Sequence, residues 1–243
     1  MSSLISDNLA RLKETLRDVR LVSILYGVSY QGNAGSCYRT ANIVGSNIPT
    51  ILVPPDGYQL QQEGLKRLQQ GFAKLKRYHT NKYVNHFILT IIWFINLLIN
   101  TGDKLRSYFP CPYDCQGLYY KRFVQDTVFF SAQRVNKKDQ DVASPLFYNI
   151  SWDQLLPLLF VEGFQICLVE NDSRYAKQNL YRYGIDSETR YALVMGSEIA
   201  GLPEQALQSG DQIFIPTYHS KSLNVSVAHG IVLTYFNEKV QKI

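Results

Sequence analysis

The chain has 243 residues, 46% of them hydrophobic and 19% charged, which is enough apolar material for a sizeable core and excludes an intrinsically disordered polypeptide. Four cysteines exclude a small disulfide-built fold and fit a reducing compartment. The formal net charge of +5 permits a polyanionic partner without demonstrating one. No secretory signal is recognisable near Met1, and Asp7, Glu14 and Asp18 disfavour a transit peptide, so we expect a cytoplasmic protein.

The first 57 residues predict alternating helices and buried strands. Apolar residues recur at helical spacing over 9–19, with charged residues between them, which is typical of an amphipathic helix. The apolar runs 21–27 and 48–53 predict buried strands. Between them we expect a loop of small and polar residues over 29–36, followed by a short helix that ends at Gly45.

Residues 58–143 break this alternation and are predicted to be an insertion or variable region. The run 87–99 is almost continuously apolar but shorter than the roughly 20 residues that a membrane-spanning helix needs. We therefore predict no membrane span and interpret the run as a buried or interface helix. Shallow membrane contact is the alternative.

Two further features of the insertion have open interpretations. The basic stretch 66–77 could follow an RNA backbone or could be a solvated helix face. Cys111 and Cys115 could bind zinc together with His79 and His86. Because the spacing is irregular and no second cysteine pair exists, we predict no metal site.

Alternating strands and helices are predicted again over residues 144–243. Ser151 and Gln154 have capping-box spacing, which predicts a helix from there to about Glu162. The following elements are predicted in chain order: strand 164–170, helix 173–183, strand 191–195, strand 211–216 and helix 222–240. Continuously apolar strands that alternate with helices indicate an α/β domain with a mostly parallel sheet. Residues 1–57 and 144–243 are its two parts.

Three predicted strand-to-helix loops, 32–41, 195–203 and 215–228, carry most of the polar residues of interest. Ligands bind beyond the carboxyl ends of the strands in such a sheet. Taken singly, each loop has an ordinary explanation, such as turn glycines, a solvated acid, or Ser222 capping the last helix. Together they place five polar side chains at one end of the sheet, which predicts a functional site: Asn33, Arg39, Glu198, Ser222 and Asn224.

The three loops resemble a known family. The order GN-x-G-x-x-x-RTA, GSE-x-x-GLP and IP-x-x-x-x-x-SLNVSVA is similar to the motifs of the SpoU–TrmH branch of the SPOUT RNA methyltransferases, and SLNVSVA is the most specific of them. The resemblance covers about 20–53 and 150–240. It implies a mostly parallel sheet with helices on both faces and a C-terminal trefoil knot, which ordinary topology rules would not predict. It also implies a homodimer, with the final helix and the first-motif helix at its interface.

The resemblance implies S-adenosylmethionine as the cofactor. Gly196, Ile215 and Leu223 match residues that line the cofactor site, and Gly201 and Ser226 match positions whose backbone groups lie nearby. Main-chain contacts in an apolar pocket suit the recognition of an adenine and a ribose edge.

The implied reaction is methyl transfer to a ribose 2′-hydroxyl of tRNA or rRNA. Arg39 and Asn33 match the first motif. The family proposal makes this arginine a base, but a guanidinium holds its proton so firmly that this role is chemically demanding. We expect Arg39 instead to bind the adjacent phosphate and steer the 2′-oxygen. Glu198 is expected to orient an arginine or a loop, and Ser222 and Asn224 to position the ribose or hold the knot loops.

Three alternatives are kept open. The chain could be a catalytically silent knotted RNA-binding protein, or a knotted methyltransferase that acts on an RNA base. A nucleotide-binding oxidoreductase is disfavoured because no G-x-G-x-x-G follows a predicted strand. The implied methyl transfer to a ribose does not require a catalytic histidine, so His219 and His229 are interpreted as structural.

Overall fold

The computed structural model describes residues 2–28, 30–45, 47–55, 73, 87–91, 144–148, 150–171, 178–198, 200–218 and 222–241. The chain divides into two compact units, residues 1–55 with 115–243 and residues 56–114. The basic stretch 66–77, His79, His86, Cys111 and Cys115 lie outside the described residues, apart from position 73. Of the apolar run only the helical residues 87–91 are described, with Ile88 buried and Phe87 exposed. Among the described helices, none is long and apolar enough to cross a membrane.

One parallel sheet organises the first unit. Within the described residues, seven strands pair in the order β3-β2-β1-β6-β4-β7-β5, and every pair is parallel. The strands are β1 Leu21–Tyr26, β2 Thr50–Val53, β3 Leu146–Tyr148, β4 Phe164–Val169, β5 Gln178–Asn179, β6 Arg190–Met195 and β7 Asp211–Phe214. The predicted mostly parallel sheet is confirmed. The trefoil knot stays a prediction.

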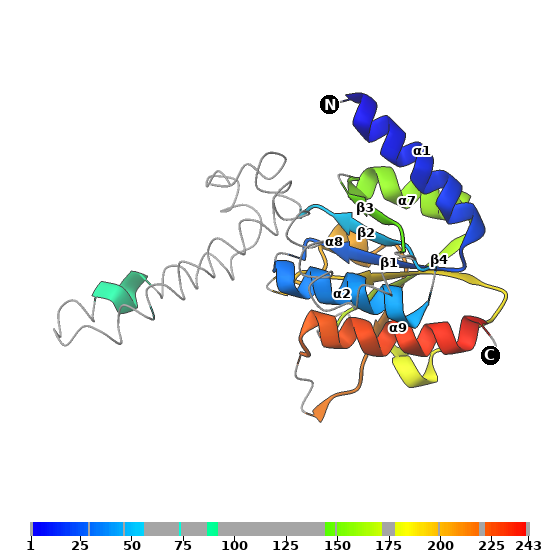
Figure 1. Ribbon diagram of the computed structural model, residues 1–243. Helices are drawn as coiled ribbons and strands as arrows, with labels where there is room; N and C mark the ends of the chain where they lie inside the picture. Colours follow the sequence, from blue (N-terminus) through cyan, green and yellow to red (C-terminus); the bar gives the residue numbers. More distant parts are fainter. Residues whose placement is uncertain are drawn as a thin grey trace. The chain divides into compact units, whose positions relative to one another are not determined.

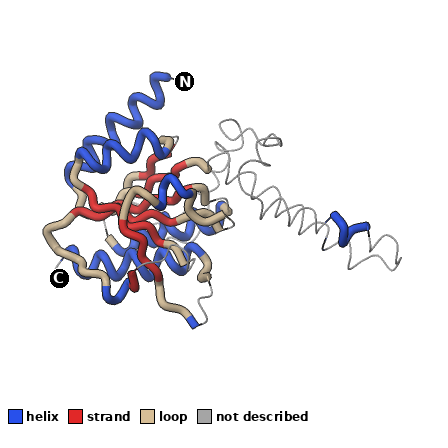
Figure 2. The backbone as a smooth tube through the Cα atoms, turned by 180° about the vertical axis from the view of Figure 1, so that it is seen from behind, coloured by secondary structure: helices blue, strands red, loops and turns tan. Residues whose placement is uncertain are grey.

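Helices cover both faces of the sheet, as predicted. Helices α1 and α7 lie on one face, and α2 and α9 lie side by side on the other (Figure 1, Figure 2). Their bounds are α1 Ser2–Asp18, α2 Gln31–Val44, α7 Trp152–Val161 and α9 Val225–Gln241, with the short helix α8 at Glu204–Leu207. Alternate residues of β1 enter the two cores, so Ile24 packs in the cluster of α1 and α7, and Leu21 in that of α9. The predicted capping box at Ser151 and Gln154 begins α7.

Helix α2 begins earlier than predicted. Residues 31–36 were expected to form a loop, yet they are helical from Gln31. The hydroxyls of Ser36 and Thr40 donate to the carbonyl oxygens four residues before them, and Ala34 and Cys37 are fully buried. Packing of α2 against α9 outweighs the low helix propensity of the glycines, because most helix stability in proteins comes from tertiary contacts.

The predicted helix over 173–183 is wrong where it can be compared. Gln178–Asn179 form β5, which pairs with β7, and Leu180–Arg182 form a 3₁₀ turn. The Asn179 side chain accepts a hydrogen bond of 2.9 Å from the Tyr181 N–H, so it caps the turn. Leu180 is fully buried, and this burial stabilises the turn in place of a helix. Residues 173–177 lie outside the described residues.

Helix α9 begins at Val225, three residues later than predicted. Asn224 caps it, because its Oδ1 accepts hydrogen bonds from the Ser226 N–H at 2.9 Å and the Ser226 hydroxyl at 2.6 Å. Ser222 lies before the helix, so the explanation of Ser222 as its cap is wrong.

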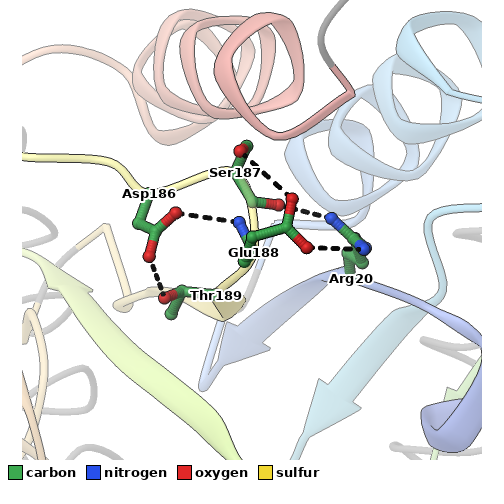
Figure 3. Close-up of polar contacts among 5 residues, drawn as sticks. All are labelled: Arg20, Asp186, Ser187, Glu188 and Thr189. Atoms are coloured by element: carbon green, nitrogen blue, oxygen red, sulfur yellow. Dashed lines mark hydrogen bonds and ion pairs between the residues drawn. The ribbon is translucent and has the colours of Figure 1, made fainter.

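The amino-terminal edge of the sheet is held by arginines. Arg190 donates to the carbonyl oxygens of Leu16, Val19 and Glu162, which joins the ends of α1 and α7 to β6. Arg20 donates to the Ser187 carbonyl and pairs with Glu188 at 3.3 Å, in the turn that leads into β6 (Figure 3). Both arginines act at the edge opposite to the predicted site.

A buried histidine joins α9 to β1. His229 is 1% exposed, and its Nε2 lies 2.7 Å from the Ser23 hydroxyl. Burial lowers its pKa from 6.5 to about 4. This location supports the structural interpretation of His229, whereas His219 lies outside the described residues.

We expect acid to destabilise the protein through His229. The unfolded chain binds a proton near pH 6.5 and the folded chain only near pH 4, so stability falls as the pH is lowered through this window. Between about pH 7.5 and about pH 5 the loss is roughly 2 kcal/mol. Urea unfolding of the wild type and of His229→Gln at both values tests this, because the variant lacks the titrating group. An equal pH dependence in both proteins would contradict the assignment.

Candidate active site at the carboxyl edge of the sheet

The predicted site lies where β1, β6 and β7 end. Because these strands are parallel members of one sheet, the loops that follow them meet at its carboxyl edge. An apolar cluster forms the floor beneath them: Leu25, Val28, Ala34, Cys37, Leu52, Met195 and Val225. Burial raises the pKa of the Cys37 thiol, with a further contribution from the Glu198 charge, so this thiol stays protonated and is not a nucleophile.

A chain of hydrogen bonds links residues from all three loops. The Asn33 Nδ2 donates to Glu198 Oε1 at 2.8 Å, and the Asn224 Nδ2 donates to Asn33 Oδ1 at 3.2 Å. The Asn224 Oδ1 in turn accepts from Ser226, so the chain runs Glu198–Asn33–Asn224–Ser226. We call this the amide chain. The structure thus brings together Asn33, Glu198 and Asn224, as predicted from the sequence.

At both ends of the amide chain, the partner fixes which group donates and which accepts the hydrogen bond. The Glu198 carboxylate only accepts hydrogen bonds, so Asn33 directs its amino group to Glu198 and its carbonyl to Asn224. At the other end the Ser226 N–H only donates, so Asn224 directs its carbonyl there. The two amide planes are therefore oriented from both sides, which holds Asn33 in one position at the start of α2.

Glu198 is exposed on a tightly closed turn. Ser197 and Gly201 exchange two backbone hydrogen bonds of 3.2 and 2.9 Å, and the Ala200 N–H donates to the Ser197 hydroxyl. Gly201 has φ +68°, a conformation that favours glycine. A Cβ on Gly196 would lie 2.6 Å from the carbonyl carbon of Gly201, so these two backbones can approach only without a side chain at 196.

The third loop presents apolar side chains and the start of α9. Ile215 is buried and packs with the core of α9, whereas Leu223 is 39% exposed. Ser222 is exposed and, among the described hydrogen bonds, takes no part in the amide chain. The third motif is thus divided between a buried end at Ile215 and an exposed end at Leu223.

Arg39 is partly buried on α2, six residues after Asn33. Helix geometry places it about 9 Å further along the axis. None of the described hydrogen bonds joins it to Asn33, Glu198 or Asn224. Arg39 thus lies on the same helix as Asn33, and its predicted role stays a prediction.

Glu170 is an acidic residue of this edge that the sequence motifs do not include. It follows β4, and its two carboxylate oxygens accept from the backbone N–H groups of Asn171 at 2.9 Å and Leu202 at 3.3 Å. An acid directly after a buried parallel strand is the only local signal for it. In the part of the chain that is described, no group of histidine, cysteine and acidic residues could hold a metal ion.

Comparisons with known proteins bear on this site. A profile of the SpoU rRNA Methylase family matches residues 100–234, which include the second and third loops but not the first. A comparison of the chain with curated proteins found no match. The solved structures that match include an rRNA methyltransferase from Sinorhizobium meliloti, with 20% identity and a TM-score of 0.52 over 92% of this chain and 59% of that one. This chain therefore spans less than two thirds of that protein.

Two other solved structures are similar. The A. aeolicus TrmH/SpoU tRNA modifying enzyme is 18% identical, with a TM-score of 0.51 over 98% of this chain and 85% of that one. AviRb from Streptomyces viridochromogenes, solved in complex with AdoMet, is 14% identical, with a TM-score of 0.51 over 93% of this chain and 64% of that one. These likenesses agree with the α/β fold. Since the profile matches more than half of the residues, the chain belongs to the SpoU rRNA methylase family.

Proposed function

We propose that the protein transfers a methyl group from S-adenosylmethionine to a ribose 2′-hydroxyl of tRNA or rRNA. Its family is one of RNA methyltransferases. That the methyl group goes to a ribose, and not to a base, is part of the proposal. The observation that supports it most is the amide chain, which joins Asn33, Glu198 and Asn224 from three separate loops.

The residues present at this edge fit the cofactor of the family, S-adenosylmethionine, which supplies an electrophilic methyl group. Ile215 and Leu223 offer apolar side chains for an adenine, and the loops that carry them offer backbone N–H and C=O groups. The carboxylates of Glu170 and Glu198 lie on the same edge and favour a ligand that carries a sulfonium cation. We assign Gly196, Gly201, Ile215, Leu223 and Ser226 to the cofactor site.

The acceptor side of the reaction is assigned to α2 and the amide chain. A 2′-hydroxyl is a poor nucleophile until its proton is withdrawn or its oxygen is held in line with the methyl group. Asn33, oriented from both sides, is suited to hold the ribose without reorganisation. Arg39 binds the adjacent phosphate through its planar guanidinium. Ser222, exposed beside Asn224, contributes to the ribose contact.

A methylation assay with labelled cofactor and bulk tRNA or rRNA tests the proposal. Alkali cleaves RNA through the 2′-hydroxyl, so a 2′-O-methyl group is expected to appear in an alkali-resistant dinucleotide. Label recovered only in mononucleotides would show a base methyltransferase. Tight RNA binding without transfer of label would show a catalytically silent protein.

We also propose that the protein is a homodimer through α2 and α9. The two helices pack together, with Gly230 of α9 facing Thr40 of α2. Ile43 is 70% exposed and Val227 is 51% exposed, a high exposure for large apolar side chains. Ser36 on α2 and Thr234 on α9 are exposed and uncharged, whereas the exposed charges of α9, Glu238 and Lys239, lie towards its C-terminal end. Exposed apolar side chains among uncharged polar residues suit a self-complementary interface.

Charges placed on this face are expected to give monomers. The double variant Ile43→Glu, Val227→Glu would bring like charges from the two protomers into the interface, which outweighs the apolar contacts. Light scattering after size-exclusion chromatography measures the mass. Val161→Glu is the matched control, because Val161 is 75% exposed on α7, on the other face of the sheet. A dimer that persists in the double variant would contradict the assignment.

A further inference from the structure

We propose that Glu170 is a positioning residue for the methyl-donor site, which holds the loop 196–202 in the form that binds the donor. This inference rests on the proposed function, because the loop contains Gly196 and Gly201 of the assigned cofactor site. Glu170 itself lies outside the three motifs and follows β4, the strand between β6 and β7 in the sheet.

Both oxygens of the Glu170 carboxylate serve as acceptors for backbone groups. Oε1 accepts from the Asn171 N–H at 2.9 Å, and Oε2 accepts from the Leu202 N–H at 3.3 Å. Hydrogen bonds to an ionised acceptor are stronger than those between neutral groups. The side chain thereby ties the end of β4 to the far end of the loop that follows β6.

This pair of contacts requires a carboxylate. A glutamine has the same shape but only one acceptor oxygen, so its amino group would face one of the two N–H donors. That donor would lose its partner and would face another donor. Glu170→Gln is therefore expected to disturb the loop without changing the volume of the side chain.

Glu170 lies close to Gly201, and Gly201 in turn lies close to Gly196. A Cβ on Gly201 would lie 2.8 Å from Glu170 Oε2, and a Cβ on Gly196 would lie 2.6 Å from the carbonyl carbon of Gly201. The carboxylate thus lies against Gly201, and the backbone of Gly201 lies against Gly196. A displacement of Glu170 is transmitted to the backbone of Gly201 and from there to Gly196.

The same end of β4 also contacts β7 through Glu170, and the loop that follows β7 through Asn171. The Glu170 N–H donates to the Ile213 carbonyl at 3.0 Å, and the Asn171 Nδ2 donates to the Thr217 hydroxyl at 3.5 Å. Glu170 and Asn171 therefore join the two loops that are assigned to the donor. A loop held in its binding form before the ligand arrives avoids the entropy cost of ordering at binding.

The test compares Glu170→Gln and Glu170→Ala with the wild type. Calorimetry with S-adenosylmethionine is expected to show about tenfold weaker binding in Glu170→Gln and at least that loss in Glu170→Ala. The KM for the donor rises in parallel, while kcat at saturating donor stays within about threefold, because saturating donor selects the binding form of the loop, in which Glu198 and the amide chain keep their places. Glu188→Gln is the matched control, since Glu188 is an exposed carboxylate at the opposite edge (Figure 3).

The outcomes separate this inference from the proposed function. A wild type that binds no donor would end both. A wild type that binds the donor, with unchanged binding in Glu170→Gln, would overturn the role of Glu170 alone. An equal loss of kcat at saturating donor would also overturn it. If Glu170→Ala does not fold, as judged by circular dichroism, the isosteric Glu170→Gln carries the test.

Discussion

Arg39→Ala is expected to lower kcat at least about 100-fold and to leave donor affinity within about twofold. Arg39 lies on α2, which carries none of the positions assigned to the donor site. Its expected partner is the phosphate beside the acceptor ribose, so its loss affects the seating of the 2′-oxygen. Single-turnover methylation measures the first quantity, and calorimetry with S-adenosylmethionine measures the second.

Two further arginine variants make the Arg39 result specific. Arg39→Lys keeps the charge but loses the planar, two-pronged donor, so activity intermediate between the wild type and Arg39→Ala is expected. Arg20→Ala removes an exposed arginine at the opposite edge of the sheet and should have wild-type kcat (Figure 3). A large loss of donor affinity in Arg39→Ala would contradict the placement of Arg39 on the acceptor side.

Gly196→Val is expected to weaken donor binding by about 100-fold or more, whereas Arg39→Ala leaves donor binding nearly unchanged. A Cβ at this position would lie 2.6 Å from the Gly201 carbonyl carbon and 2.7 Å from the Leu202 nitrogen. Both are backbone atoms, which cannot rotate away, so the turn 197–201 must move. Calorimetry with S-adenosylmethionine measures the loss, and Gly184→Val is the matched control because a Cβ there has open space.

The structure changes the physical reason for the Gly196 prediction. From the sequence, a branched side chain at 196 is expected to close the cofactor site directly. In the structure it would displace the turn that carries Glu198, so the amide chain would be disturbed too. Wild-type donor affinity in Gly196→Val would remove Gly196 from the assigned site.

The amino-acid sequence alone was sufficient for five of the seven described strands, but not for β3 or β5. The runs 21–27, 164–170, 191–195 and 211–216 are mostly apolar, and a strand covered on both faces requires that pattern whatever its neighbours are. The capping box at Ser151 and Gln154 was also predictable, because its partners are three residues apart. The three site loops were recognisable because the residues of each motif lie within a short stretch of the sequence.

Only the tertiary structure decided the features that depend on distant partners. The early start of α2 follows from its packing on α9, and the strand at 178–179 from pairing with β7, which the local sequence does not encode. The contact between Asn33 and Glu198 joins residues 165 positions apart. Glu170 has no motif around it, because its partner Leu202 is brought close by the order of the parallel strands. Local spacing determines elements and caps, whereas the pairing of side chains across the edge is determined by the topology that folds them together.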